Sequence, residues 1–283
     1  MRVSVRKQPS WLQALLILPG VAALVVTFVF PLLWLARTSL QPTTGHILSL
    51  HAYVRLFEDS FYWWVIGRTI VIGLLCVVIT VPMAFPVALF LARSQSRWRG
   101  TLTALAIAPL LTSTVIRTYG WMVILGRHGL INTTLVWAGI LAQPTRLDNG
   151  PFATVVALVE ILLPYGIISI LSHLSRLDAE LEQAASLLGA RRLQVFWRVL
   201  LPLSLPGLMT ASLLVFVLAI SSLVTPQLMG GGRVFVLATE IFNQTTIALD
   251  WPFAGALSIT LLAFFGIFVA LYQRILQRVE SQS

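Results

Sequence analysis

The segment Val65–Leu91 reads VIGRTIVIGLLCVVITVPMAFPVALFL, and Arg68 is its only charged residue. It is longer than the roughly 20 residues that a helix needs to cross a hydrocarbon core of about 30 Å. Lipid offers no hydrogen-bond partner to a free peptide group, so a stretch this apolar must be helical inside a membrane. The segment therefore predicts a transmembrane helix.

The rest of the 283-residue chain has the same character. It is 58% hydrophobic and 10% charged, and its mean hydropathy of +0.89 exceeds what a soluble domain with a wet surface carries. Without a Ser-rich or Pro-rich linker to divide it, we expect one transmembrane domain over residues 1–283. The fold class predicted is all-α integral membrane, with about six transmembrane helices near Trp11 to Leu35, Val65 to Leu91, Leu102 to Leu125, Phe152 to Leu171, Leu205 to Leu228 and Phe253 to Leu271.

Arginine supplies nearly all of the formal charge of +9, since Lys7 is the only lysine. The arginines lie at the ends of apolar stretches and not on one face interleaved with aromatic residues, so the charge does not predict nucleic-acid binding. Positively charged flanks are retained on the cytoplasmic side of a membrane. Their distribution predicts a multi-pass protein with both termini in the cytoplasm.

Motifs for enzymatic chemistry are missing from the sequence. It contains no His-Glu-x-x-His helix, no Gly-x-Ser-x-Gly elbow and no glycine-rich phosphate loop. The single cysteine, Cys76, excludes a disulfide or a cysteine-cluster metal site, and its apolar neighbours predict packing. We therefore expect no enzyme activity and no cofactor bound by this chain.

The polar segment 172–204 between the fourth and fifth apolar stretches is predicted to be cytoplasmic. Asp178 is suited to cap a helix, Glu180 and Glu182 would lie in its first turn, and Gly189 would end it. Apolar residues at helical spacing form one narrow face, which predicts a binding partner. These residues are Leu177, Leu181, Ala184, Ala185 and Leu188.

A second amphipathic stretch begins at Arg191 and Arg192. We expect it to end at Pro202, before Pro206 starts the fifth span. A helical hairpin on the membrane surface, with its arginines toward lipid phosphates, is an alternative interpretation of the whole segment.

The spacing in this segment resembles the cytoplasmic signature of ABC importer permeases: Glu-Ala-Ala, three residues, Gly, nine residues, Ile, one residue, Leu-Pro. Here it reads Gln183-Ala184-Ala185, three residues, Gly189, nine residues, Val199-Leu200-Leu201-Pro202. Only the first position departs from the signature: it is Gln183 instead of Glu, and an acid, Glu182, lies one residue earlier. The resemblance implies the type I ABC importer permease fold and a coupling helix that inserts into a groove on an ATP-hydrolysing subunit. Its implied coupling residues are Leu181, Glu182, Gln183, Ala184, Ala185, Leu188, Gly189, Leu201 and Pro202.

A looser pattern resembles the polyamine (spermidine and putrescine) permease branch of that family. It comprises Pro109, Arg117-Thr118-Tyr119-Gly120-Trp121, Leu125-Gly126, Gly129, Asn132 and Leu163-Pro164. The resemblance implies import of a polyamine or similar organic cation across the bacterial inner membrane. It implies as partners ABC ATPase subunits that hydrolyse the ATP, a second permease subunit of different sequence and an external solute-binding protein.

Two charged residues lie inside predicted spans, Arg117 and Glu160, and each is expected to face the bundle or water. Two alternatives are open: the residues pair and fix helix packing, or a free Glu160 meets a cationic substrate beside aromatic ring faces. The predicted pathway residues are Arg117, Tyr119, Trp121, Asn132 and Glu160. A different class of function, an ion-coupled transporter or an oligomeric channel subunit without an ATPase partner, is also open, although ion-coupled transporters usually contain an inverted repeat.

Overall fold

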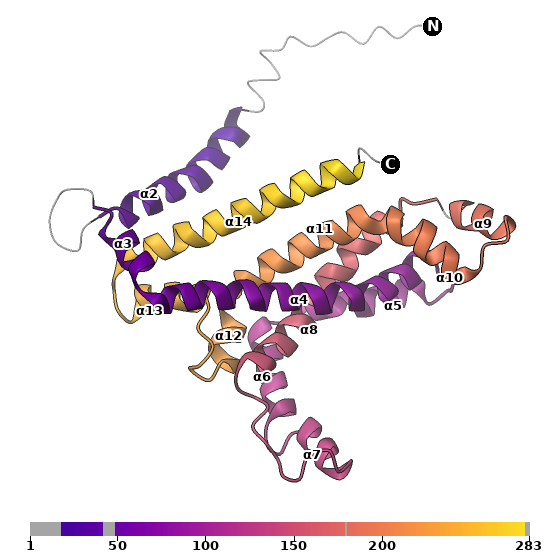
Figure 1. Ribbon diagram of the computed structural model, residues 1–283, viewed down its shortest axis with the longest axis horizontal. Coiled ribbons are helices and arrows are strands. Elements are labelled where there is room, and N and C mark those ends of the chain that lie inside the picture. Colours follow the sequence, from indigo (N-terminus) through magenta and orange to yellow (C-terminus); the bar gives the residue numbers. More distant parts are fainter. Residues whose placement is uncertain (1–17, 42–48, 179, 281–283) are drawn as a thin grey trace, which may run out of the picture.

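The computed structural model describes residues 18–41, 49–178 and 180–280, and in that part of the chain all regular structure is helical (Figure 1). This confirms the predicted all-α class. The α-helices are α2 (Phe30–Ser39), α3 (His51–Glu58), α4 (Ser60–Arg93), α5 (Arg99–Ile107), α6 (Thr114–Leu125), α7 (Leu130–Trp137), α8 (Pro151–Leu174), α9 (Glu180–Leu187), α10 (Arg192–Val195), α11 (Leu201–Ile220), α12 (Val224–Met229), α13 (Leu237–Thr246) and α14 (Trp251–Glu280). A 3₁₀ turn, η2 (Ala108–Leu111), follows α5, and π-helical turns occur at η1 (Val25–Val29) and η3 (Phe196–Leu200).

Within the described residues, five helices are long and apolar enough to cross a membrane, and a bent pair of helices makes a sixth. This confirms the prediction of about six spans. Trp11, where the first span was predicted to begin, lies outside the described residues. The spans are Leu18–Ser39, Ser60–Arg93, Pro151–Leu174, Arg192–Ile220 and Trp251–Arg274, and the bent pair is Arg99–Leu111 with Thr114–Trp137.

Three helices, α4, α8 and α11, form the centre of the bundle (Figure 1). Their apolar side chains meet in a cluster that includes Cys76, Leu158 and Val215, and Cys76 is fully buried as predicted. Small residues allow the backbones to approach: a Cβ added at Gly166 of α8 would lie 3.2 Å from the Cβ of Ala84 in α4. Close approach of this kind drives helix association in lipid, where there is no hydrophobic effect between helices.

The remaining long helices lie alongside this centre. α14 packs against α2 and α11, and Phe268 stacks on Phe216 with ring centroids 3.8 Å apart. At one end of the bundle, α3 and α13 close the core through a cluster that contains Leu56, Leu237 and Phe253. The opposite end carries α9 and α10, with α5 nearby (Figure 1).

The third span is not the continuous helix Leu102 to Leu125 that the sequence predicts. Its two halves are bent by 96°, and Thr112 and Ser113 between them are extended. Pro109, inside the 3₁₀ turn at the bend, has no N–H to continue the helical ladder. The prediction was wrong because hydropathy measures the length of an apolar run and not its direction. After the bend, α6 packs against α8 and α12, and α7 projects away from the rest of the bundle (Figure 1).

The fifth span also differs from its predicted limits, Leu205 to Leu228. One helix runs from Arg192 to Ile220, so the second amphipathic stretch and the span are continuous and Pro202 does not end the stretch. The wide turn η3 loosens the ladder directly before Pro202, which has no N–H to donate. At the other end, Pro226 cannot donate to the carbonyl of Ser222, so the helix stops and α12 forms separately.

Candidate functional site

The helix predicted between Asp178 and Gly189 is present as α9, Glu180–Leu187. Glu180 and Glu182 lie in its first turn, as predicted, where carboxylates complement the helix dipole. Its C-terminus is closed by two hydrogen bonds: the amide of Gly189 donates to the carbonyl of Ser186, and that of Ala190 to the carbonyl of Ala185. This is the Schellman arrangement, which needs the left-handed backbone that Gly189 adopts at φ +86°. The local sequence therefore fixes the C-terminal end of α9, whereas residue 179, directly before its first residue, lies outside the described residues, so the predicted cap by Asp178 stays a prediction.

The outer face of α9 is apolar and exposed. Leu181 is 48% exposed, and Leu187 and Leu188 are 88% and 89% exposed. Gln183 and Ala184 are exposed as well. Large aliphatic side chains this open, on a helix without a buried residue of its own, indicate a surface that another protein covers.

The single apolar face predicted for this helix is divided in the structure. Leu177 precedes the helix and packs against a core cluster of the bundle, and Ala185 is half-buried. Leu187, which was absent from the predicted set, joins the exposed surface. The prediction assigned Leu177 to the helix, although the helix begins at Glu180. It also left out Leu187, which does not share the helical spacing of Leu181, Ala184 and Leu188.

Leu201 and Pro202 lie away from α9. Both belong to the first turn of α11, where Leu201 packs against the same core cluster as Leu177 and Pro202 is exposed. Two residues of the signature therefore belong to the membrane helix that follows, and the exposed leucines belong to α9.

Glu182 is turned toward the bundle and forms an ion pair with Arg93, the last residue of α4. The closest nitrogen and oxygen lie 2.8 Å apart, and the two side chains are 24% and 28% exposed. Sequence reasoning missed Arg93, because it precedes Glu182 by 89 residues and no local pattern joins them.

The two intramembrane charges do pair. Arg117 of α6 donates to both carboxylate oxygens of Glu160 in α8, with a closest distance of 2.7 Å. It also donates to the main-chain carbonyls of Glu160, at 3.0 Å, and of Pro109, at 3.2 Å. The Glu160 carbonyl lacks its usual helical donor because residue 164 is a proline. Arg117 thus ties both halves of the broken span to the kinked helix α8.

The other predicted pathway residues differ in their surroundings. Trp121 joins the ion pair, since its indole nitrogen donates to Glu160 at 3.3 Å. Tyr119 is 53% exposed. Asn132 is fully buried: it donates to the carbonyls of Leu125 and Gly126 and accepts from the amide of residue 145, so it holds the turn before α7. The structure brings together Arg117, Trp121 and Glu160, but not Tyr119 or Asn132.

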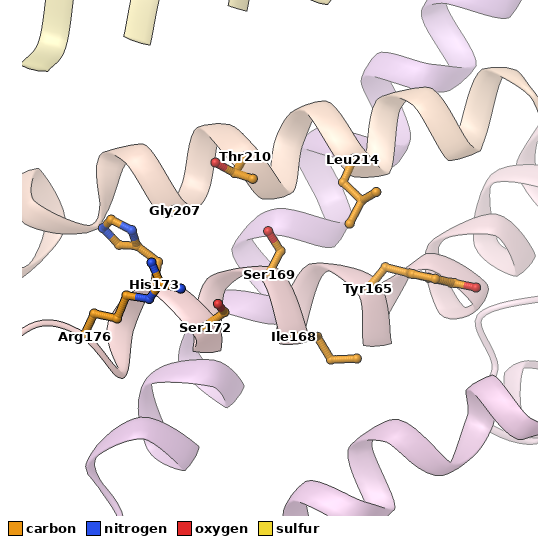
Figure 2. Close-up of a pocket in the computed structure, with 9 residues that line it drawn as sticks. All are labelled: Tyr165, Ile168, Ser169, Ser172, His173, Arg176, Gly207, Thr210 and Leu214. Carbon is orange, nitrogen blue, oxygen red and sulfur yellow. The ribbon is translucent and has the colours of Figure 1, made fainter. Parts of the chain in front are cut away.

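A groove of about 390 Å³ lies between parts of α8 and α11, and Figure 2 shows its lining. His173 and Arg176 lie at one end, Ser169 and Thr210 face each other, and Tyr165 lies at the other end. No acidic residue lines it, so it offers no countercharge to a cation. Among the described residues there is also no group of three or more His, Cys, Asp or Glu side chains that could hold a metal ion.

Comparison with known proteins gives the family. Residues 65–281 match the model of the binding-protein-dependent transport system inner membrane component. The chain belongs to this family. The match covers the bundle from α4 to α14, together with α9 and the broken span.

Two curated relatives and one solved structure show how far the similarity extends. This inner membrane component is 31% identical over 265 residues to the spermidine/putrescine transport system permease protein PotB of Haemophilus influenzae, covering 94% of this chain and 90% of the relative. It is 34% identical over 228 residues to PotB of Escherichia coli, covering 81% and 82%. A bacterial ABC transporter involved in alginate import has the same fold in one chain, with a TM-score of 0.78, 18% identity and coverage of 95% and 96%.

The family and the fold agree on the general activity. The chain is a multi-pass inner membrane permease subunit of a binding-protein-dependent importer, with the type I ABC importer permease fold. Its family and its curated relatives are transport components.

Proposed function

We propose that this permease works in an ATP-driven polyamine importer and that α9 is the helix gripped by a separate ATP-hydrolysing subunit. The observation that carries the proposal is the exposure of Leu187 and Leu188, 88% and 89%, on a firmly capped helix at one end of the bundle. A capped helix keeps its shape under load, and exposed leucines supply apolar area for a groove on the partner.

The lever mechanism follows from this arrangement. Two ATPase subunits that close on ATP move their grooves, and α9 moves with them as a rigid body. The membrane helices then change between inward-open and outward-open states. Such coupling requires that the ATPase binds α9 differently in the two states, since only a differential affinity shifts an equilibrium.

The orientation is part of the same proposal. Arg93, Arg97, Arg99 and Arg176 lie at the membrane ends nearest α9, and arginine-rich flanks stay in the cytoplasm. The end that carries α9 is therefore cytoplasmic, and both chain termini lie on that side. A second permease subunit of different sequence completes the pathway, a solute-binding protein docks at the opposite end, and this chain binds no cofactor of its own.

A polyamine is the proposed substrate because the chain is similar to two PotB permeases over most of its length. Glu160 is not the proposed cation ligand, since both of its carboxylate oxygens accept hydrogen bonds inside the protein. The exposed ring of Tyr119 instead offers a face to a passing ammonium group. Replacing it with Leu should raise the KM for spermidine, and replacing it with Phe should preserve the KM.

Co-purification tests the ATPase contact. The wild-type chain is expressed with the second permease and candidate ATPase subunits, and co-elution is compared with that of the variant Leu187→Glu/Leu188→Glu. Two charges on the exposed face should abolish co-elution and leave the thermal stability of the permease unchanged, because neither leucine packs against the bundle. Retained co-elution of the double variant would refute the proposed contact.

Transport tests the substrate and the competing function. A deletion strain that carries the wild-type gene should take up labelled spermidine or putrescine, and loss of the ATPase subunit should stop the uptake. A self-sufficient ion-coupled transporter or channel predicts uptake without that subunit. Failure to take up either polyamine, with co-elution intact, would refute the substrate and leave the ATP-driven importer.

A further inference from the structure

Arg93 joins the end of α4 to the loop that carries α9. Its Nε and Nη2 atoms each lie 2.8 Å from the Oε1 atom of Glu182. Its Nη1 atom donates to the main-chain carbonyl of Leu177 at 3.1 Å. One planar guanidinium therefore contacts α9 and the segment that enters it, a geometry that the single ammonium of lysine does not reproduce.

This contact is the polar connection between α9 and the core helices. Residues 177–190 form hydrogen bonds or ion pairs with one residue outside segment 172–204 among the described residues. That residue is Arg93. No residue of α9 is buried. α9 also packs against α10 and η3, the beginning of the fifth span, and Leu177 packs against the core, but Arg93 makes its polar contact with α4.

The helix that Arg93 ends runs through the whole core. From one end to the other, α4 contributes Leu91 to one hydrophobic cluster, Cys76 to a second and Val65 to a third. Pro82 and Pro86 lie inside its last third, where two ladder hydrogen bonds are missing and bending is easier. A displacement of Arg93 thus moves a helix that contributes to three hydrophobic clusters of the bundle.

The one-residue shift in the signature explains why the acid points inward. Successive residues on a helix are about 100° apart, so an acid at Glu182 faces a different direction from one at position 183. Glu182 is 28% exposed and meets Arg93, whereas Gln183 is exposed at the outer surface of α9. In this chain the carboxylate is engaged inside the subunit.

From this geometry we infer that Arg93 is a positioning residue that transmits the movement of α9 to α4. The inference rests on the proposed coupling function of α9 and adds the route by which its movement enters the bundle. When the ATPase subunit displaces α9, the ion pair with Glu182 draws the cytoplasmic end of α4 along, and bending of α4 at Pro82 and Pro86 absorbs the change of direction.

The test uses the complete transporter in proteoliposomes, with the second permease, the ATPase subunits and the binding protein, and labelled spermidine as the probe. The variants are Arg93→Gln, Glu182→Gln and the charge swap Arg93→Glu/Glu182→Arg. Arg97→Gln is the matched control, because it removes the same charge beyond the same helix end from a residue without an ion pair to any described residue. Co-elution, ATP hydrolysis and spermidine taken up per ATP hydrolysed are measured.

Both single variants should still co-elute and hydrolyse ATP, and spermidine uptake per ATP should fall about fivefold, at the low end of allosteric couplings. The charge swap should recover most of that loss, and Arg97→Gln should match the wild type. A merely structural contact would lower the thermal stability of the complex without changing uptake per ATP.

Three results would overturn the inference. The first is unchanged uptake per ATP in both single variants. The second is loss of co-elution in them, since Arg93 would then serve assembly. The third is a charge swap no better than either single change. Failure of the wild-type chain to co-elute with any ATPase subunit would instead refute the proposed function, and this inference with it.

Discussion

The ion pair between Arg117 and Glu160 predicts how much stability three different substitutions should remove, because the structure gives the burial of each charge. Replacing Arg117 with Met removes the donors to the Glu160 carboxylate and to the carbonyls of Glu160 and Pro109. The Arg117 side chain is 10% exposed, so water cannot fully replace these bonds. Breaking a buried pair in this way costs about 3–5 kcal/mol, and we expect about 3 kcal/mol because Glu160 is 33% exposed.

The variant Glu160→Gln should cost less. Gln keeps one acceptor oxygen at the same place, and Arg117 retains its bonds to the two main-chain carbonyls. We expect about 1–2 kcal/mol, because a neutral hydrogen bond to Arg117 replaces one to a charged group. The control is Arg55→Gln, which removes an ion pair to Asp250 of similar length, 2.9 Å, whose arginine is 45% exposed. An exposed pair contributes about 0–1 kcal/mol.

Thermal unfolding of the purified permease in detergent measures which of the three variants loses most stability. At about 2 °C per kcal/mol for a chain of this length, the Tm should fall by about 6 °C for Arg117→Met, about 2–4 °C for Glu160→Gln and less than about 2 °C for Arg55→Gln. If Glu160→Gln lowers the Tm as much as Arg117→Met, the carboxylate alone matters. The stabilising role of the hydrogen bonds from Arg117 to the carbonyls of Pro109 and Glu160 is then refuted. Equal Tm values for all three would refute the role of burial.

Three further substitutions test local features. Gly189→Val should strain the left-handed turn after α9 by about 1–2 kcal/mol and reduce co-elution with the ATPase subunit, whereas Gly139→Val, with φ +72° and an equally open surrounding, should leave co-elution unchanged. Asn132→Ala should lower the free energy of unfolding by about 1–3 kcal/mol in denaturant titration, because two carbonyls and one amide each lose a hydrogen bond. Gly73→Ala places a Cβ 2.7 Å from the Ile220 side chain and should lower the Tm by overpacking the contact between α4 and α11, while Gly67→Ala, with nothing within 4 Å, should not.

The pairing of Arg117 with Glu160 also bears on the proposed import of a polyamine. An acid that is neutralised inside the subunit fixes the shape of the broken span and does not attract substrate. The groove between α8 and α11 offers arginine, histidine and hydroxyl groups but no carboxylate. Recognition of a polyamine by this chain is therefore expected to depend on aromatic faces and backbone carbonyls more than on a buried acid.

Much of the fold could be predicted because it depends on local properties. Apolar length determines which segments cross a membrane, so the number of spans and the all-α class follow from hydropathy alone. The C-terminal end of α9 is equally local: a glycine after its last turn fixes it wherever it lies in the fold. The helix that ends at Gly189 could therefore be predicted from the sequence.

What only the tertiary structure decided involves direction and distant partners. The 96° bend at Thr112 and Ser113 and the continuous helix through Pro202 depend on contacts with neighbouring segments, such as the bonds of Arg117 to the carbonyls of Pro109 and Glu160. The pairing of Arg93 with Glu182 joins residues 89 positions apart, and only packing brings them together. Hydropathy and helical spacing are properties of one segment, whereas an ion pair or a bend is a property of two segments in space, and for that physical reason the sequence by itself did not determine them.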